Sequence, residues 1–320
     1  MPESRFEVKT LYLLLIACPA LFAAGHNALL PQPQQVRYGE GRLPLAGLSI
    51  VLASSSAPED AFAMTRLSEG LGRRGGSPGA HTLRLTRTGP VDALPRDNEQ
   101  PGPDSRESYH LRITPAGGEV RARSSAGLFY AVETILQLVE SSGKDAALPT
   151  VEIDDWPSLA YRGVMFDLSH GPLPTEDEIK RQIDFLARWK GNQYYFYSEL
   201  SIELKSYPLI NPGGRYSQDQ VRRIIAYARE RHVDVVPCME FFGHLHDLFR
   251  IERYADQAAL PHGGDLNPRN PEMQRMLEDW VEEMTALFPS PWFHIGLDEP
   301  WELERAGTAG GIEQIGRAHV

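Results

Sequence analysis

Cysteine is scarce in this sequence. Only Cys18 and Cys238 occur among its 320 residues, and Cys18 lies in an N-terminal stretch that we expect to be removed. A mature chain with a single cysteine cannot form an intramolecular disulfide, which excludes the small proteins that depend on a disulfide framework. We therefore expect stability to come from hydrophobic packing, for which a chain of this length has room in two domains.

An excess of basic residues is also missing. The 32 Lys and Arg residues are outnumbered by 43 Asp and Glu residues, which gives a formal net charge of -11. Because binding to nucleic-acid phosphates relies on clustered Lys and Arg, we expect no nucleic-acid partner. No Gly-rich phosphate loop follows any strand-like run, which argues against nucleotide binding. A neutral substrate suits this composition better.

The apolar stretch at residues 11–24 is too short for a stable membrane anchor. It ends in small residues, as at the cleavage site of a secretory signal peptide, so we predict a signal peptide over residues 1–25 and a secreted or periplasmic protein. The residues before Cys18 also resemble a bacterial lipoprotein cleavage box. We expect no membrane contact unless Cys18 carries a lipid.

Residues 28–155 predict a small α+β domain. Strand-like runs occupy residues 48–52, 82–85, 109–113 and 119–122, and helical spacing of apolar residues occupies 61–71 and 126–139. The Pro- and Gly-rich segment 89–103 predicts a loop.

From residue 156 the pattern changes to strand, loop and helix, repeated. The strand candidates are 162–168, 193–197, 234–239 and 292–295. The helices between them begin with capping residues. Thr175 and Ser217, each with Glu or Gln three residues on, predict a reciprocal capping box, and Asn270 is followed by Pro271 at the first helical position. Apolar faces that would cover a sheet include Ile179, Ile183, Leu186, Val221, Ile224, Met273, Met276, Trp280, Val281 and Met284.

Repeated βα units indicate a parallel sheet, either a closed barrel or an open doubly wound sheet. A complete (β/α)8 barrel typically needs about 250 residues, whereas only about 155 follow Tyr161. The prediction that we adopt is an α/β chain: the N-terminal α+β domain, then the first half of a (β/α)8 TIM barrel over residues 156–314. Residues 315–320 resemble the translation of a common sequencing adapter, and we expect them to be an artefactual end.

The doublet Asp298-Glu299 is the strongest candidate for a catalytic site. Other acidic doublets, at 59–60, 176–177 and 278–279, fall in helical stretches, where charged neighbours normally form a solvated face. Asp298 and Glu299 instead follow a short apolar run and Gly296, and Pro300 then ends the strand by removing a backbone donor. At a strand end both carboxylates can face one ligand, whereas side chains alternate within a strand.

Polar residues near the other three strand candidates are expected to converge with this pair, because barrel enzymes place their chemistry where the parallel strands end. They are Arg162 and Asp167 on the first strand, Glu199 after the second, and Glu240 and His244 after the third. Ordinary alternatives stay open for each residue. Arg162 could pair with Asp155 in the linker, His244 could be an ordinary loop histidine, and the two glutamates could face solvent.

Three motifs resemble glycoside hydrolase family 20, the β-N-acetylhexosaminidases: residues 161–167 (YRGVMFD), 237–244 (PCMEFFGH) and 294–299 (HIGLDE). Residues 28–155 are similar to the small domain that precedes the barrel of that family. The resemblance implies removal of terminal N-acetylhexosamine residues from glycans, without a cofactor and without a metal. The oligomeric state and the exact sugar stay open.

The resemblance also implies a role for each candidate residue. Glu299 would be the general acid/base, and Asp298 would orient the substrate's 2-acetamido group in a substrate-assisted, retaining reaction. Arg162 would bind sugar hydroxyls, and His244 would support the acidic pair. Asp167, Glu199 and Glu240 complete the expected substrate site.

Several residues depart from the family pattern. Leu297 replaces a Gly, strand two ends in Tyr197-Ser198-Glu199 where a His and an Asp-rich turn are usual, and Cys238 and Glu240 stand where Glu and Asp are usual. We expect this polypeptide itself to be inactive or poorly active, because pocket aromatics would come from the other half of the barrel. Two other interpretations stay open: a non-catalytic carbohydrate-binding relative, and a metal-dependent barrel hydrolase using Glu240, His244, His246 and Asp298.

Overall fold

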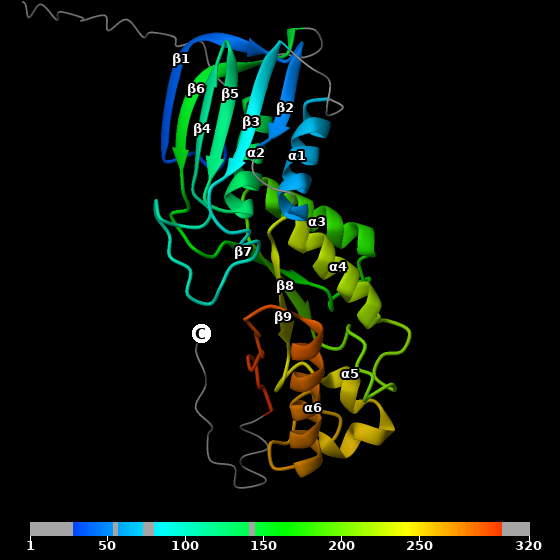
Figure 1. Ribbon diagram of the computed structural model, residues 1–320. Helices are drawn as coiled ribbons and strands as arrows, with labels where there is room; N and C mark the ends of the chain where they lie inside the picture. Colours follow the sequence, from blue (N-terminus) through cyan, green and yellow to red (C-terminus); the bar gives the residue numbers. More distant parts are fainter. Residues whose placement is uncertain (1–27, 54–56, 73–79, 141–144, 303–320) are drawn as a thin grey trace, which may run out of the picture.

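The computed structural model describes residues 28–53, 57–72, 80–140 and 145–302. The predicted signal peptide, Cys18 and the predicted artefactual end lie outside the described residues. The described chain forms an N-terminal unit built on a six-stranded sheet and a second unit built on a three-stranded parallel sheet (Figure 1). Among the described helices, none combines the length and the apolar character that crossing a membrane needs.

Two helices cover the six-stranded sheet of the N-terminal unit (Figure 1). The strands are β1 (Gln35–Pro44), β2 (Leu48–Leu52), β3 (His81–Arg87), β4 (Tyr109–Thr114), β5 (Gly117–Ala122) and β6 (Ala147–Asp155). They lie in the order β1-β6-β4-β5-β3-β2, with β2, β3 and β5 parallel and the other pairs antiparallel. Helices α1 (Pro58–Gly70) and α2 (Ser125–Leu138) pack together and against this sheet, and α2 is buried along most of its length.

Strands β1 and β6 are absent from the sequence prediction. Nearly every residue of β1 is exposed, so the strand carries no alternation of apolar and polar side chains, and its register shifts between Tyr38 and Arg42. Strand β6 does alternate, but it contains Pro149, a residue that normally argues against an interior strand. The other predicted strands of this unit are found, and β2 matches the predicted residues.

The second unit repeats the βα pattern that the sequence predicts. Its parallel strands β7 (Gly163–Asp167), β8 (Gln193–Ser198) and β9 (Asp234–Met239) lie in that order, and the helices are α3 (Glu176–Arg188), α4 (Gln218–Glu230) and α6 (Pro271–Leu287). A short helix α5 (His246–Phe249) and a 3-10 turn (Glu252–Gln257) follow β9. The register pairs Asp167 with Tyr197 and Tyr197 with Cys238, so the carboxyl ends of all three strands meet at one edge. The predicted fold class, an α+β domain before a partial parallel βα region, is confirmed.

The fourth predicted strand, 292–295, is shorter than expected. Only His294 forms a parallel bridge, to Cys238 of β9. The backbone amides of Met239 and Phe241 donate to the carbonyls of His294 and Ile295 at 3.0 and 3.2 Å. The segment therefore lies beside β9 in the predicted direction, and it delivers the acidic pair to the edge where the other strands end.

The three predicted capping residues are present, but the reciprocal box predicted at Thr175 is incomplete. Ser217 and Gln220 form the complete reciprocal box at the start of α4, and Asn270 accepts from the Glu272 amide before Pro271. Thr175 accepts from the Glu178 amide, but the Glu178 carboxylate pairs with Arg181 instead of returning to the cap. The predicted apolar faces are buried except at Val281, which is exposed because it lies at the edge of the inward stripe of α6.

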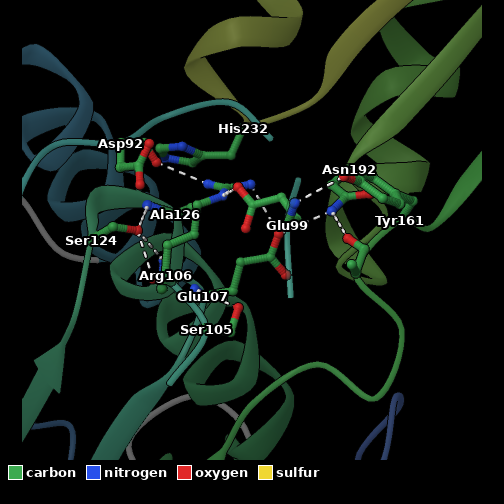
Figure 2. Close-up of polar contacts among 12 residues, drawn as sticks. Asp92, Glu99, Ser105, Arg106, Glu107, Ser124, Ala126, Tyr161, Asn192 and His232 are labelled. Carbon is green, nitrogen blue, oxygen red and sulfur yellow. Dashed lines mark hydrogen bonds and ion pairs between the residues drawn. The ribbon is translucent and has the colours of Figure 1, made fainter. Parts of the chain in front are cut away.

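A buried polar cluster joins the two units (Figure 2). Glu107, in the loop before β4, accepts hydrogen bonds from Arg106 and from the Asn192 amide, both at 3.0 Å. Glu99 pairs with Arg106 at 2.8 Å, and its backbone amide donates to the Tyr161 hydroxyl at 3.0 Å. These five residues, here called the junction cluster, fix the predicted loop 89–103 against the start of the second unit.

Candidate active site

Asp298 and Glu299 lie beside His244 at the carboxyl edge of the parallel sheet. His244 Nε2 is 3.5 Å from Glu299 Oε2 and 3.9 Å from Asp298 Oδ2. The two carboxylate side chains are 57% and 53% exposed, whereas the imidazole is mostly buried. The predicted convergence of the acidic pair with His244 is thus present, and one imidazole contacts both carboxylates.

Close backbone packing holds this arrangement. A Cβ at Gly243 would lie 3.0 and 3.2 Å from the carbonyl oxygens of Asp298 and Glu299. Gly243 is therefore needed for the close approach of the two segments, and the left-handed turn falls on His244 itself, at φ 60. Leu297 and Glu299 also have positive φ, 86 and 47. Such values in non-glycine residues store strain and cluster at functional sites.

A second layer of charged side chains supports His244. Glu199 Oε1 lies 3.6 Å from His244 Nδ1 and accepts a hydrogen bond of 3.4 Å from the Tyr197 hydroxyl. Burial raises the pKa of Glu199 above its ordinary value, although His170 and His244 oppose that effect. The imidazole of His244 thus lies between Glu199 on one side and the acidic pair on the other.

Asp167 and His170 extend this layer toward solvent. The Asp167 carboxylate accepts from the Ser169 and His170 amides and contacts His170 Nδ1 at 2.8 Å. Burial acts to raise the pKa of Asp167, but these backbone amides outweigh it, so the pKa is lowered. Asp167 raises the pKa of His170, whose Nε2 is 3.4 Å from Glu199. His170 was not predicted, and only its place three residues after a strand-end aspartate marks it in the sequence.

Glu240 lies beneath the acidic pair and is 1% exposed. Burial, followed by the neighbouring charge of Asp298, raises its pKa to about 8. The predicted position near the pair is correct, but this carboxyl faces Asp298 from the protein interior and is screened from solvent.

Cys238, which is close to Glu240, contacts His294. Cys238 Sγ lies 3.1 Å from His294 Nδ1. Burial, with the nearby Glu240 and Asp298 charges, raises the pKa of the thiol to about 12. A thiol in this state is an inert packing group, because the nucleophilic form of cysteine is the thiolate.

Arg162 does not join the acidic pair, so the predicted convergence fails for this residue, and its contact with sugar hydroxyls stays a prediction. It precedes β7, about 16 Å of strand from Asp167. Its guanidinium donates to Glu107 at 2.5 Å and to the Lys190 carbonyl at 2.8 Å. The alternative pairing of Arg162 with Asp155 is wrong, because the ammonium group of Lys190 donates to the Asp155 carboxylate at 2.7 Å. Arg162 instead lines a cavity of about 170 Å³ at the junction of the two units.

His246 also points elsewhere. It begins α5, and its ring packs where a Cβ at Gly264 would lie. Within the described ranges, no three His, Cys, Asp or Glu side chains are grouped so that they could hold a metal ion. Glu302 anchors the end of the acidic segment instead, since it accepts from the Gly264 amide and its own amide donates to Asp265 at 2.7 Å.

Comparison with known families gives two matches that together span almost the whole described chain. The model of the glycosyl hydrolase family 20 catalytic domain matches residues 159–308. The model of glycosyl hydrolase family 20 domain 2 matches residues 26–156. The boundary between the two matches falls in the linker that follows β6.

Individual relatives agree with these matches. The chain is 32% identical to a β-hexosaminidase of Porphyromonas gingivalis over 234 residues. This alignment covers 62% of this chain and 30% of the relative. It is 30% identical over 309 residues to a β-hexosaminidase of Vibrio furnissii, covering 85% and 48%. The solved structure of Flavobacterium johnsoniae chitobiase is similar with a TM-score of 0.74 and 25% identity, covering 88% and 46%. The chain thus spans half or less of the length of each of these proteins.

Proposed function

Because the chain belongs to glycoside hydrolase family 20, as a divergent member, we propose that Asp298 and Glu299 carry the hydrolytic removal of terminal N-acetylhexosamine residues from glycans. The observation that supports this most directly is the contact of one imidazole, His244, with both carboxylates at the carboxyl edge of a parallel sheet. We further propose that the protein is exported, to the periplasm or the medium, and meets its glycan substrate there.

The two carboxylates have different tasks in this reaction. The 2-acetamido carbonyl oxygen of the substrate attacks the anomeric carbon while Glu299 donates its proton to the departing glycosidic oxygen. An ionised Asp298 accepts the acetamido N–H and stabilises the positive charge that develops on the oxazolinium ring. Glu299, now ionised, then takes a proton from the water that attacks the anomeric carbon and reopens that ring. Retention of configuration follows from the two inversions.

The surrounding residues prepare this pair. His244 is mostly buried and contacts Glu199 on its other face, so its ring has little freedom to turn. A fixed imidazole beside Glu299 can donate to the carboxylate after proton transfer and release it when Glu299 is protonated again. We propose that the exposed side chains of His170 and Asp167, which lie beside Glu199, bind sugar hydroxyls.

Replacement of the acid/base tests the proposal. Incubation of the 320-residue chain at high concentration with an aryl N-acetylglucosaminide should release the aryl group slowly, and Glu299→Gln should reduce the rate at least 100-fold because no proton reaches the leaving oxygen. Glu278→Gln, an exposed change on α6, is the matched control and should leave the rate unchanged. Equal rates for the chain and Glu299→Gln, both above the uncatalysed background, would overturn the assignment.

Binding provides a second measurement. A thiazoline analogue of the oxazolinium intermediate should bind the chain, and Asp298→Asn should weaken binding at least 10-fold because the neutral amide no longer offers a charge to the ring. Retained binding without any hydrolysis, in the chain and in Glu299→Gln alike, would support the non-catalytic carbohydrate-binding relative instead. A hydrolysis rate that falls after exhaustive chelation would support the metal-dependent alternative.

Turnover by this chain should be slow. Asp298 and Glu299 are more than half exposed, and water at the site weakens the electrostatic stabilisation on which this chemistry depends. We therefore expect kcat below about 1 s⁻¹, the lower end of the range for natural enzymes. A steady-state kcat above about 10 s⁻¹ for the purified chain would contradict this expectation.

A further inference from the structure

Glu240 is a buried carboxyl without an obvious partner. Both of its carboxyl oxygens are inaccessible to solvent, and neither has a hydrogen-bond partner of ordinary geometry among the described residues. A buried polar group left unpaired costs several kcal/mol, and an ionised one costs more. A carboxyl in this position therefore needs a partner of a particular kind or a particular protonation state.

The backbone beneath the acidic pair is shaped around this carboxyl. Gly296 has φ 66, and a Cβ at this position would overlap the Glu240 carboxyl and lie 2.9 Å from the Glu240 Cα. Only glycine fits between β9 and the acidic pair here. Asp298 follows Gly296 by two residues, and its carboxylate is close enough to help raise the pKa of Glu240.

The titratable side chains that affect Glu240, or are affected by it, are either acidic or neutral. Asp298 from the acidic segment and Glu199 from the end of β8 both disfavour its ionisation, and Asp298 has the larger effect. Tyr197 and Cys238, the neutral neighbours on β8 and β9, both have raised pKa values that Glu240 helps to raise. Only the Leu297 backbone amide favours the ionised form of Glu240, and its effect is the smallest.

Two carboxyl groups in contact can form a hydrogen bond only when one of them carries a proton. Asp298 is more than half exposed and Glu240 is fully buried, so the proton belongs on Glu240. We propose that Glu240 is a positioning residue that stays protonated and donates a hydrogen bond to Asp298, holding that carboxylate ionised and turned toward the acetamido group. This inference rests on the proposed function for the role of Asp298, but the protonation state of Glu240 does not.

The protonation state can be measured without a substrate. In the 320-residue chain labelled with ¹³C at the Glu side-chain carboxyl, one carboxyl resonance should titrate with a midpoint near pH 8. Glu240→Gln should remove that resonance, and Asp298→Asn should lower the midpoint because a repelling charge is gone. A Glu240 resonance that titrates at the ordinary glutamate value would overturn the proposal. This titration stays informative even if the chain neither binds nor hydrolyses a sugar.

The positioning role predicts a distinct pH dependence of binding. Wild-type affinity for the thiazoline analogue should fall at least 10-fold between pH 7 and pH 9.5, because ionised Glu240 no longer donates to Asp298. Glu240→Gln keeps a donor at every pH, so it should bind within about 3-fold of wild type at pH 7 and show no alkaline loss. Glu240→Ala should be weaker at both pH values, with near-ultraviolet circular dichroism as the check on folding. An alkaline loss that persists in a folded Glu240→Gln would show that Glu240 does not position Asp298.

Discussion

Asp234 is a buried carboxyl whose ionisation opposes folding. It starts β9, is 1% exposed, and accepts a 2.7 Å hydrogen bond from the Ser290 hydroxyl. Burial raises its pKa to about 6, above its ordinary value of 3.8. A raised pKa in the folded state means that the protonated form is favoured, so the contribution of Asp234 to stability is fully present below pH 4 and is lost as pH rises through 6.

Asp234→Asn should therefore raise the free energy of unfolding at pH 7.5 by up to about 3 kcal/mol, because the amide needs no charge and still accepts from Ser290. Near pH 4 the gain should vanish, since wild-type Asp234 is then protonated as well. Urea unfolding at both pH values measures this. A gain of equal size at pH 4 and pH 7.5 would show that packing, and not ionisation, is responsible.

At this scale the sequence predicts the position of a residue better than its state. Asp298, Glu299 and His244 could be placed together because strand ends meet at one edge of a parallel sheet. The prediction fails for Arg162, since an Arg at the start of a strand faces the opposite end of the sheet from the chemistry. The protonation state of Glu240 depends on its burial against Gly296 and on the nearby charge of Asp298. Both residues are distant from Glu240 in the sequence, so no local pattern reveals that state.

The helices of the βα region depend on their first residues. At α4 the Ser217 hydroxyl accepts from the Gln220 amide at 3.2 Å, and the Gln220 side chain accepts from the Ser217 amide at 2.9 Å. Without this box, two donors in the first turn would lack partners.

Ser217→Ala should lower the free energy of unfolding by about 1 kcal/mol, which chemical denaturation can resolve. Thr285→Ala is a suitable control, because that hydroxyl donates only to carbonyls within its own helix. It should change stability by less than about 0.5 kcal/mol. Equal losses in the two variants would indicate that the Ser217 cap does not contribute.

Elements with a strong local signal are predictable in this chain, and those defined by tertiary contacts are not. The caps and inward stripes of α3 and α4 follow from residue spacing. Strand β1, with an exposed face on each side, is defined only by its pairing with β6. The segment around His294 is ordered by β9 and Gly296, so its short ladder could not be derived from its own residues.

The two units of the molecule share one set of buried charges. Glu107 is 4% exposed at its side chain and contacts Arg106, Asn192 and Arg162. Its removal would leave Arg162 buried beside Tyr130 without a carboxylate. Breaking a buried ion pair in this way is strongly destabilising.

Glu107→Ala should lower the free energy of unfolding by about 3 kcal/mol or more. Asp104→Ala is the control. It removes a carboxylate that forms an ion pair with Arg123, but the Asp104 side chain is 96% exposed. That control should cost less than about 1 kcal/mol. Thermal and urea unfolding measure both, and a small loss for Glu107→Ala would show that the junction cluster is not needed for stability.

Lys190 and Arg162 belong to the βα region, yet their carboxylate partners, Asp155 and Glu107, come from the preceding unit. An exchange of the first domain for that of a relative would therefore succeed only if the graft carried acidic residues at both places. Without them, two buried cations would face a foreign surface. The smallest portion of this chain that can be transplanted intact therefore includes both partners of each of these two ion pairs.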